Sequence, residues 1–81
     1  MKIKVETYSG YKADERPVAF YLGDNDAKLR VVEVVDRWYD PSVDYFKVKA
    51  DDGGVYILGQ YRAVYDEQEG GFWELKGFYR E

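Results

Sequence analysis

The stretch YFKVKADDGGVYIL, residues 45–58, decides the fold of this chain. Two runs rich in valine, tyrosine and phenylalanine flank an Asp-Gly step, a pattern that is typical of a β-hairpin. Asp52-Gly53 predicts a two-residue type I′ turn, because both central residues of that turn need positive φ, which glycine and aspartate tolerate best. The stretch therefore predicts two antiparallel strands joined by a tight turn.

The predicted turn also fixes the register of the hairpin. On one face it sets Ala50 opposite Val55, Val48 opposite Ile57 and Phe46 opposite Gly59. On the other face it sets Lys49 opposite Tyr56, Lys47 opposite Leu58 and Tyr45 opposite Gln60. The first face is wholly apolar or glycine, which predicts the core side. The second face combines tyrosine with lysine, which predicts a wetter side.

Turn-forming clusters of glycine, aspartate and proline recur on both sides of this hairpin: SGY at 9–11, GDND at 23–26, YDPS at 39–42 and DEQEGG at 66–71. Short runs rich in apolar and aromatic residues lie between them: KIKVETY at 2–8, RPVAFYL at 16–22 and FWELKGFY at 72–79. We therefore predict one all-β domain over residues 1–81, with five or six antiparallel strands strongly bent into a small barrel or roll.

The run RPVAFYL carries two further expectations. Its alternation places Val18, Phe20 and Leu22 on one face of the strand. Pro17 suits the first position of a strand, where the missing N–H donor is tolerated.

The segment VVEVVDRWYDP, residues 31–41, is compatible with either a helix or a strand. Its apolar residues follow a helical spacing, and an aspartate of the preceding GDND cluster could cap a helix. Four β-branched valines lose rotamer freedom in a helix, and strands are expected on both sides, so we favour a strand. The apolar pattern changes phase along it, which predicts either a β-bulge near Val31–Val32 or a long coiled strand that passes between the two halves of a barrel.

The same phase places Trp38 on the face of Val32 and Val34. We therefore expect Trp38 to be a core anchor rather than a docking residue. Arg37 and Tyr39 point the other way and are candidates for contact with a partner.

Composition excludes several classes of chemistry. The chain has no cysteine and no histidine, so disulfides, thiolate or imidazole metal sites and histidine-based catalysis are absent. Ser9 and Ser42 are the only serines and Thr7 the only threonine, so a hydrolytic triad is excluded. We expect no enzyme activity, no catalytic residue, no cofactor and no metal.

The net charge and the hydropathy of the chain limit the classes of partner that it can bind. The net charge of −4 argues against a dedicated duplex-binding protein, which usually carries a strong basic field. No apolar run approaches the ~20 residues that a membrane-spanning helix needs, so we expect no membrane partner and a cytoplasmic location.

Three blocks of the chain, RVVEVVDRWYDP at 30–41, YFKVKADDGGVYIL at 45–58 and FWELKGFY at 72–79, together resemble a family of small bacterial proteins known only as a domain of unknown function. The matching positions are Phe20, Val32, Trp38, Val48, Asp52, Gly53, Tyr56, Leu58, Trp73 and Leu75. These are fold-determining residues. The resemblance therefore implies an architecture and carries over no catalytic residue.

Two regions are candidate interaction surfaces. Tyr45, Lys47, Lys49 and Tyr56 alternate ring and positive charge on the wet face of the hairpin. Such a face resembles the stacking platforms of single-strand nucleic-acid binders, although exposed lysines also keep a sheet soluble. The charged loop GYKADERP at 10–17 could form a recognition tip through Tyr11, Lys12 and Arg16, or could be a solvated loop.

These observations favour a non-catalytic binding or protein-interaction module with an unknown protein partner. The first alternative is an accessory module that binds single-stranded nucleic acid, a DNA-repair-related role. The second alternative is a barrel that binds a small molecule. A protein-interaction module predicts a contiguous exposed patch of apolar or aromatic side chains.

Overall fold

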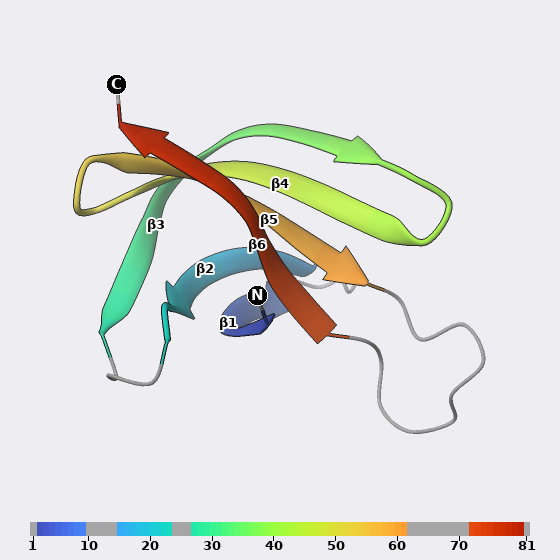
Figure 1. Ribbon diagram of the computed structural model, residues 1–81, viewed down its shortest axis with the longest axis horizontal. Coiled ribbons are helices and arrows are strands. Elements are labelled where there is room, and N and C mark those ends of the chain that lie inside the picture. Colours follow the sequence, from blue (N-terminus) through green and yellow to red (C-terminus); the bar gives the residue numbers. More distant parts are fainter. Residues whose placement is uncertain (1, 10–14, 24–26, 62–71, 81) are drawn as a thin grey trace.

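Six antiparallel strands make up the computed structural model (Figure 1). The structure describes residues 2–9, 15–23, 27–61 and 72–80. The strands are β1 (Lys2–Ser9), β2 (Glu15–Tyr21), β3 (Lys28–Tyr39), β4 (Val43–Ala50), β5 (Gly54–Tyr61) and β6 (Phe72–Arg80). Each strand pairs with the next, and β6 closes the barrel on β1. The predicted all-β barrel is confirmed, and the ambiguous segment is strand.

Strand β3 belongs to both halves of the barrel. Its first residues pair with β2, and the rest of the strand then bends to run along β4, as Figure 1 shows. Its register with β4 shifts between Val31 and Glu33, so Val32 is a bulge residue. The predicted bulge near Val31–Val32 is confirmed.

A second shift, between Val34 and Asp36, makes Val35 another bulge residue. One extra residue moves every following side chain to the other face of a strand. Trp38 therefore pairs with Tyr45 on the outer face and is 38% exposed, while Arg37 lies opposite the buried Phe46. The prediction of Trp38 as a core anchor was wrong. Arg37 lies on the face of Phe46 rather than on the face expected for it, but it is exposed.

The hairpin between β4 and β5 forms, but its register differs from the prediction by one residue. Tyr56 pairs with Val48, not with Lys49. The Gly53 N–H donates to the Ala50 carbonyl (3.0 Å), and Gly53 has φ of +87°. This is a three-residue loop in which a turn is followed by a left-handed glycine. The shift carries Tyr56 from the predicted wet face into the core, where it is 6% exposed.

The core lies inside the barrel and is built mainly from β4 and β5. Its buried members are Phe20, Phe46, Val48, Ala50, Tyr56 and Leu58. The Phe20 and Tyr56 rings meet edge to face at 5.0 Å, and the Phe46 and Trp73 rings lie 5.5 Å apart. Partly buried aliphatic side chains of β1, β3 and β6, together with Leu22 just after β2, pack around this cluster.

Strand β2 also contains a bulge. Glu6 pairs with Ala19 and Thr7 with Pro17, so Val18 has no partner on β1. Val18 is 40% exposed, and its predicted place on the face of Phe20 was wrong. Pro17 is the third residue of β2 rather than its first, and its side chain is fully buried. The described residues include no helix of the length and apolarity that a membrane crossing requires.

Candidate functional site

The ladder between β2 and β3 is short. It contains three pairs, from Tyr21↔Lys28 to Ala19↔Arg30, whereas the β4–β5 ladder contains seven. Beyond Ala19, β2 continues through the bulge at Val18 and through Pro17, which has no N–H to donate to a neighbouring strand. These features separate the two strands after their third pair.

The separation leaves a groove of about 430 Å³. Its lining comes from Tyr8 of β1, residues 16–18 of β2 and residues 31–34 of β3. Arg16 on β2 and Glu33 on β3 place opposite charges in the lining, and the Arg16 guanidinium lies 5.6 Å from the centre of the Tyr8 ring. Of the predicted site residues that the structure describes, Arg16 is the one that lines this groove.

Exposed apolar side chains gather around the groove. Tyr8 is 54% exposed, Val18 40% and Val32 64%, and Val35 farther along β3 is 46% exposed. Val18 and Val32 are bulge residues of their strands, which explains why two valines of a barrel face solvent. Clustered apolar exposure of this kind marks an interaction site more often than scattered apolar residues do.

A second, polar hollow of about 240 Å³ adjoins the groove at Val18, which lines both. It lies over Ala19, with Glu6 of β1 on one side and Lys28 and Arg30 of β3 on the other. The Tyr21 hydroxyl donates to Glu6 Oε2 (2.8 Å), and Lys28 Nζ lies 3.0 Å from Glu6 Oε1. The bond from Tyr21 and then that from Lys28 lower the pKa of Glu6, so it is charged at neutral pH.

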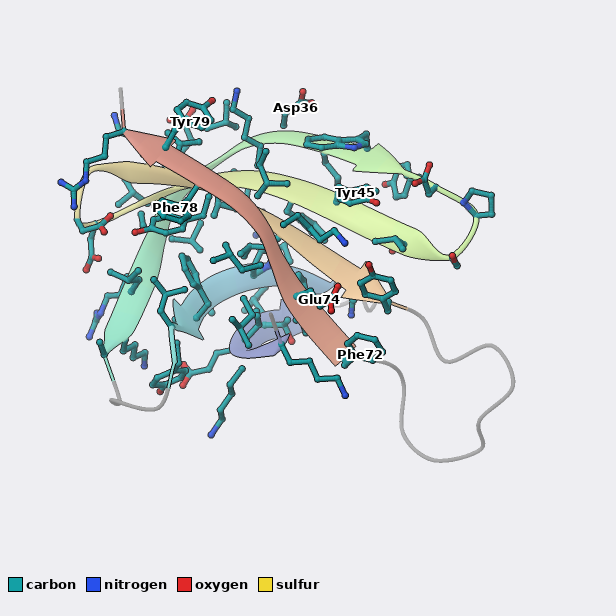
Figure 2. The ribbon with its side chains drawn as sticks, viewed as in Figure 1. Asp36, Tyr45, Phe72, Glu74, Phe78 and Tyr79 are labelled. Atoms are coloured by element: carbon teal, nitrogen blue, oxygen red, sulfur yellow. The ribbon has the colours of Figure 1, made fainter. Side chains whose placement is uncertain are left out.

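The predicted stacking platform lies on the outer face of β3–β6, where its Lys49 faces Glu33 of the groove lining. Trp38 and Tyr45 stack there with ring centres 5.4 Å apart and 15° between their planes. Lys47 Nζ lies 5.3 Å from the centre of the Tyr79 ring. Figure 2 shows Asp36 and Tyr79 on this outer side and Phe78 on the opposite side of the sheet.

Carboxylates accompany the lysines of this outer face. Lys47 lies directly opposite Asp36, and Lys49 directly opposite Glu33. Opposite charges on facing positions of two strands attract each other and reduce the field that either would present to a ligand. The outer face of β3–β6 thus combines exposed rings with nearly balanced charge.

Tyr56 does not belong to this platform. Its hydroxyl donates to Asp52 Oδ2 (2.6 Å), while Asp52 Oδ1 accepts from the Gly54 N–H (2.8 Å). The bond from Tyr56 is the main cause that lowers the pKa of Asp52, and burial raises the pKa of Tyr56. These contacts tie the hairpin loop to β5, so Tyr56 has a structural role in the fold.

The remaining predicted residues lie elsewhere. The Arg37 guanidinium lies 4.8 Å from the Phe46 ring centre and 5.3 Å from that of Tyr39, so Arg37 and Tyr39 lie together near the end of β3. Tyr11 and Lys12 lie outside the described residues, as do the clusters at 24–26 and 66–71. The structure therefore does not bring the predicted surface residues together into one patch.

Sequence analysis missed Tyr8, Val18, Val32 and Glu33 as site residues. Two features of the sequence lay close to the site: a proline inside a strand-like run, and the phase change at Val31–Val32. Both mark points where a ladder is interrupted. Neither shows by itself that the two interruptions lie next to each other in the barrel.

Within the described ranges, no three aspartate or glutamate side chains come together as potential metal ligands. Comparisons with known proteins give no match, whether with family models, curated proteins or solved structures. The resemblance to small bacterial proteins of unknown function therefore stays a prediction.

Proposed function

We propose that this barrel is a non-catalytic protein-interaction module that binds an extended segment of a partner protein in the groove between β2 and β3. The observation that carries the proposal is the early end of the β2–β3 ladder beside exposed Val18 and Val32. A contiguous exposed apolar patch is the feature that distinguishes an interaction surface from ordinary protein surface.

The shape of the groove favours an extended ligand. Its two long walls are strands, and within the described residues β3 has no strand partner on its β2 side beyond Arg30. A peptide strand can add its backbone hydrogen bonds to such an edge, while alternate side chains enter the space between the walls. Val32 and Val18 would contact those side chains.

Two other functions have weaker support. A nucleic-acid platform on β3–β6 would need a positive field, and its lysines lie opposite Asp36 and Glu33. A small-molecule barrel would need an internal cavity, and the interior is packed around Phe20, Phe46 and Leu58, each at most 1% exposed.

Selection from a random-peptide display library tests the proposal. Bound peptides are synthesised and titrated into the isotope-labelled barrel, and the amide shifts are mapped by NMR. We expect the shifts to gather at residues 16–18 and 31–34. Shifts confined to the outer face of β4–β6, or no enriched peptide at all, would contradict it.

A matched pair of variants sharpens this test. Val32→Asn replaces an apolar side chain of the groove by a polar one without changing the charge, and it should weaken binding of the selected peptides about tenfold, which corresponds to about 1.4 kcal/mol. Phe78→Asn is the control, since Phe78 on β6 is similarly exposed at 68% but does not line the groove. Equal losses in both variants would indicate non-specific hydrophobic binding.

A further inference from the structure

Positive charge is concentrated on the outer face of β1, β2 and the first residues of β3. The side chains on this face follow two cross-strand rows, Lys4–Tyr21–Lys28 and Glu6–Ala19–Arg30, with Arg16 beyond them opposite Tyr8. We call Lys4, Arg16, Lys28 and Arg30 the basic face. Of the described carboxylates, Glu6 is the one that lies among them, so this part of the surface is positive although the whole chain carries −4.

Glu6 does not cancel the field of the basic face. It is held by Tyr21 and Lys28, and it offsets one of four cations. Two further carboxylates lie at the margins. Asp51 accepts a bond from the Arg30 backbone N–H (3.3 Å), and Glu33 lies opposite Lys49 of β4. Among the residues that the structure describes, and with Lys49 counted, five cations face three carboxylates, which leaves a positive balance.

Arg30 is the cation best placed to meet a ligand. Its side chain is exposed at the polar hollow above Ala19, and within the described part of the chain its guanidinium has no ion-pair partner. A guanidinium pairs with a carboxylate through two parallel hydrogen bonds, which gives both strength and direction. An acidic side chain that enters the hollow would meet Arg30 and the half-exposed Lys28 ammonium.

The polar hollow and the groove adjoin each other at Val18, which lines both. An extended segment that lies in the groove can therefore reach the hollow as well. Its side chains alternate in direction, with about 6.7 Å between neighbours on the same side. From this adjacency and the charge of the basic face we infer that the partner segment is an acidic peptide, with apolar side chains against the valines of the groove and carboxylates on the basic face.

This inference rests on the proposed function and specifies its ligand. The valine-lined groove favours a peptide over a polynucleotide, because a phosphate backbone offers no apolar side chain to fill it. The charge complementarity favours acidic over neutral or basic peptides.

The test uses two pools of short fluorescein-labelled peptides with valine or isoleucine at alternate positions. One pool has aspartate or glutamate between them, and the other has asparagine or glutamine. Affinity is measured by fluorescence anisotropy. We expect the acidic pool to bind about tenfold tighter at about 20 mM salt, and the difference to shrink at about 300 mM as the charges are screened.

Two double variants with the same change in net charge locate the effect. Lys28→Gln with Arg30→Gln should remove most of the preference for the acidic pool. Lys47→Gln with Arg80→Gln, on other faces, should retain it within about twofold. Circular dichroism confirms that both variants fold. Equal losses in the two variants would overturn the inference, because long-range net charge would then explain the preference.

The outcomes separate this inference from the proposed function. If both pools bind equally and Val32→Asn weakens both, the acidic partner is overturned and the interaction groove is kept. Binding of neither pool would overturn both. In a third outcome, oligothymidylate binds more tightly than the acidic pool, and the double variant Lys28→Gln with Arg30→Gln loses this binding. That result would overturn the inference of a peptide ligand and assign the basic face to nucleic acid.

Discussion

The β4–β5 hairpin and the β2–β3 pair are both antiparallel neighbours, yet they use their residues differently. The first has seven consecutive pairs without a register shift and supplies most of the buried core. The second has three pairs and then separates beside exposed valines. The buried contacts that stabilise the fold are therefore concentrated in the β4–β5 half of the barrel. The β2–β3 half can bind a partner with little loss in the free energy of unfolding.

The largest test of this comparison is a pair of truncations, one in each region. Leu58→Ala removes a fully buried side chain of β5 and should cost about 2–5 kcal/mol through lost burial and a cavity. Val18→Ala, at the exposed bulge of β2 beside the β2–β3 pair, should change stability by at most about 0.5 kcal/mol. Urea unfolding measures the stability of both variants. Similar losses in the free energy of unfolding would show that the two regions contribute equally to the core.

The hairpin loop provides the next test. Gly53 has φ of +87° and an added Cβ would meet nothing within 4 Å, so Gly53→Ala isolates backbone strain. We expect a loss of about 1–2 kcal/mol. Gly77→Ala on β6 is the control, because its Cβ also has open space and its φ is not in the left-handed region. A cost at Gly77 as large as at Gly53 would contradict the strained turn.

This turn also shows what the sequence could and could not predict. Alternation and the Asp-Gly step located both strands of the hairpin. They could not distinguish a two-residue from a three-residue loop, because Asp52 and Gly53 suit both. The difference of one residue decides on which face Tyr56 lies. The fold was therefore predictable, whereas the surface made by this hairpin was not.

The groove was hidden from the sequence for a different reason. Each strand was predicted from its own residues, but the groove is lined by Val18 and Val32, which are bulge residues on two separate strands. Bulges depend on the partner strand as much as on the bulged one. The second bulge, at Val35, likewise reversed the direction expected for Trp38.

A smaller effect tests the bond between Tyr56 and Asp52 that fastens the stable hairpin. Tyr56→Phe removes the 2.6 Å bond to Asp52 Oδ2 and should cost about 1 kcal/mol at neutral pH. Because this bond lowers the pKa of Asp52, its stabilisation is present above the ordinary value of 3.8 and is lost as the pH falls below it.

The stabilities of the wild type and Tyr56→Phe should therefore converge in acid, as measured by urea unfolding across that range. Tyr39→Phe, on a 61% exposed ring, serves as the control and should change little at any pH. A difference between wild type and Tyr56→Phe that stays constant through acid pH would show that Asp52 is not the partner that matters.

The smallest effect on stability is expected at Val32, and it provides the most direct test of the role of the groove in binding. Val32→Thr keeps the β-branched shape at a position that is 64% exposed, so it should change the free energy of unfolding by less than about 0.5 kcal/mol. The same hydroxyl in a buried complex would lack a partner and should weaken groove-bound peptides several-fold. This combination of results would show that Val32 contributes to ligand binding rather than to folding. If Val32→Thr instead unfolds the barrel as readily as Leu58→Ala, the groove belongs to the core and the contrast between the two halves fails.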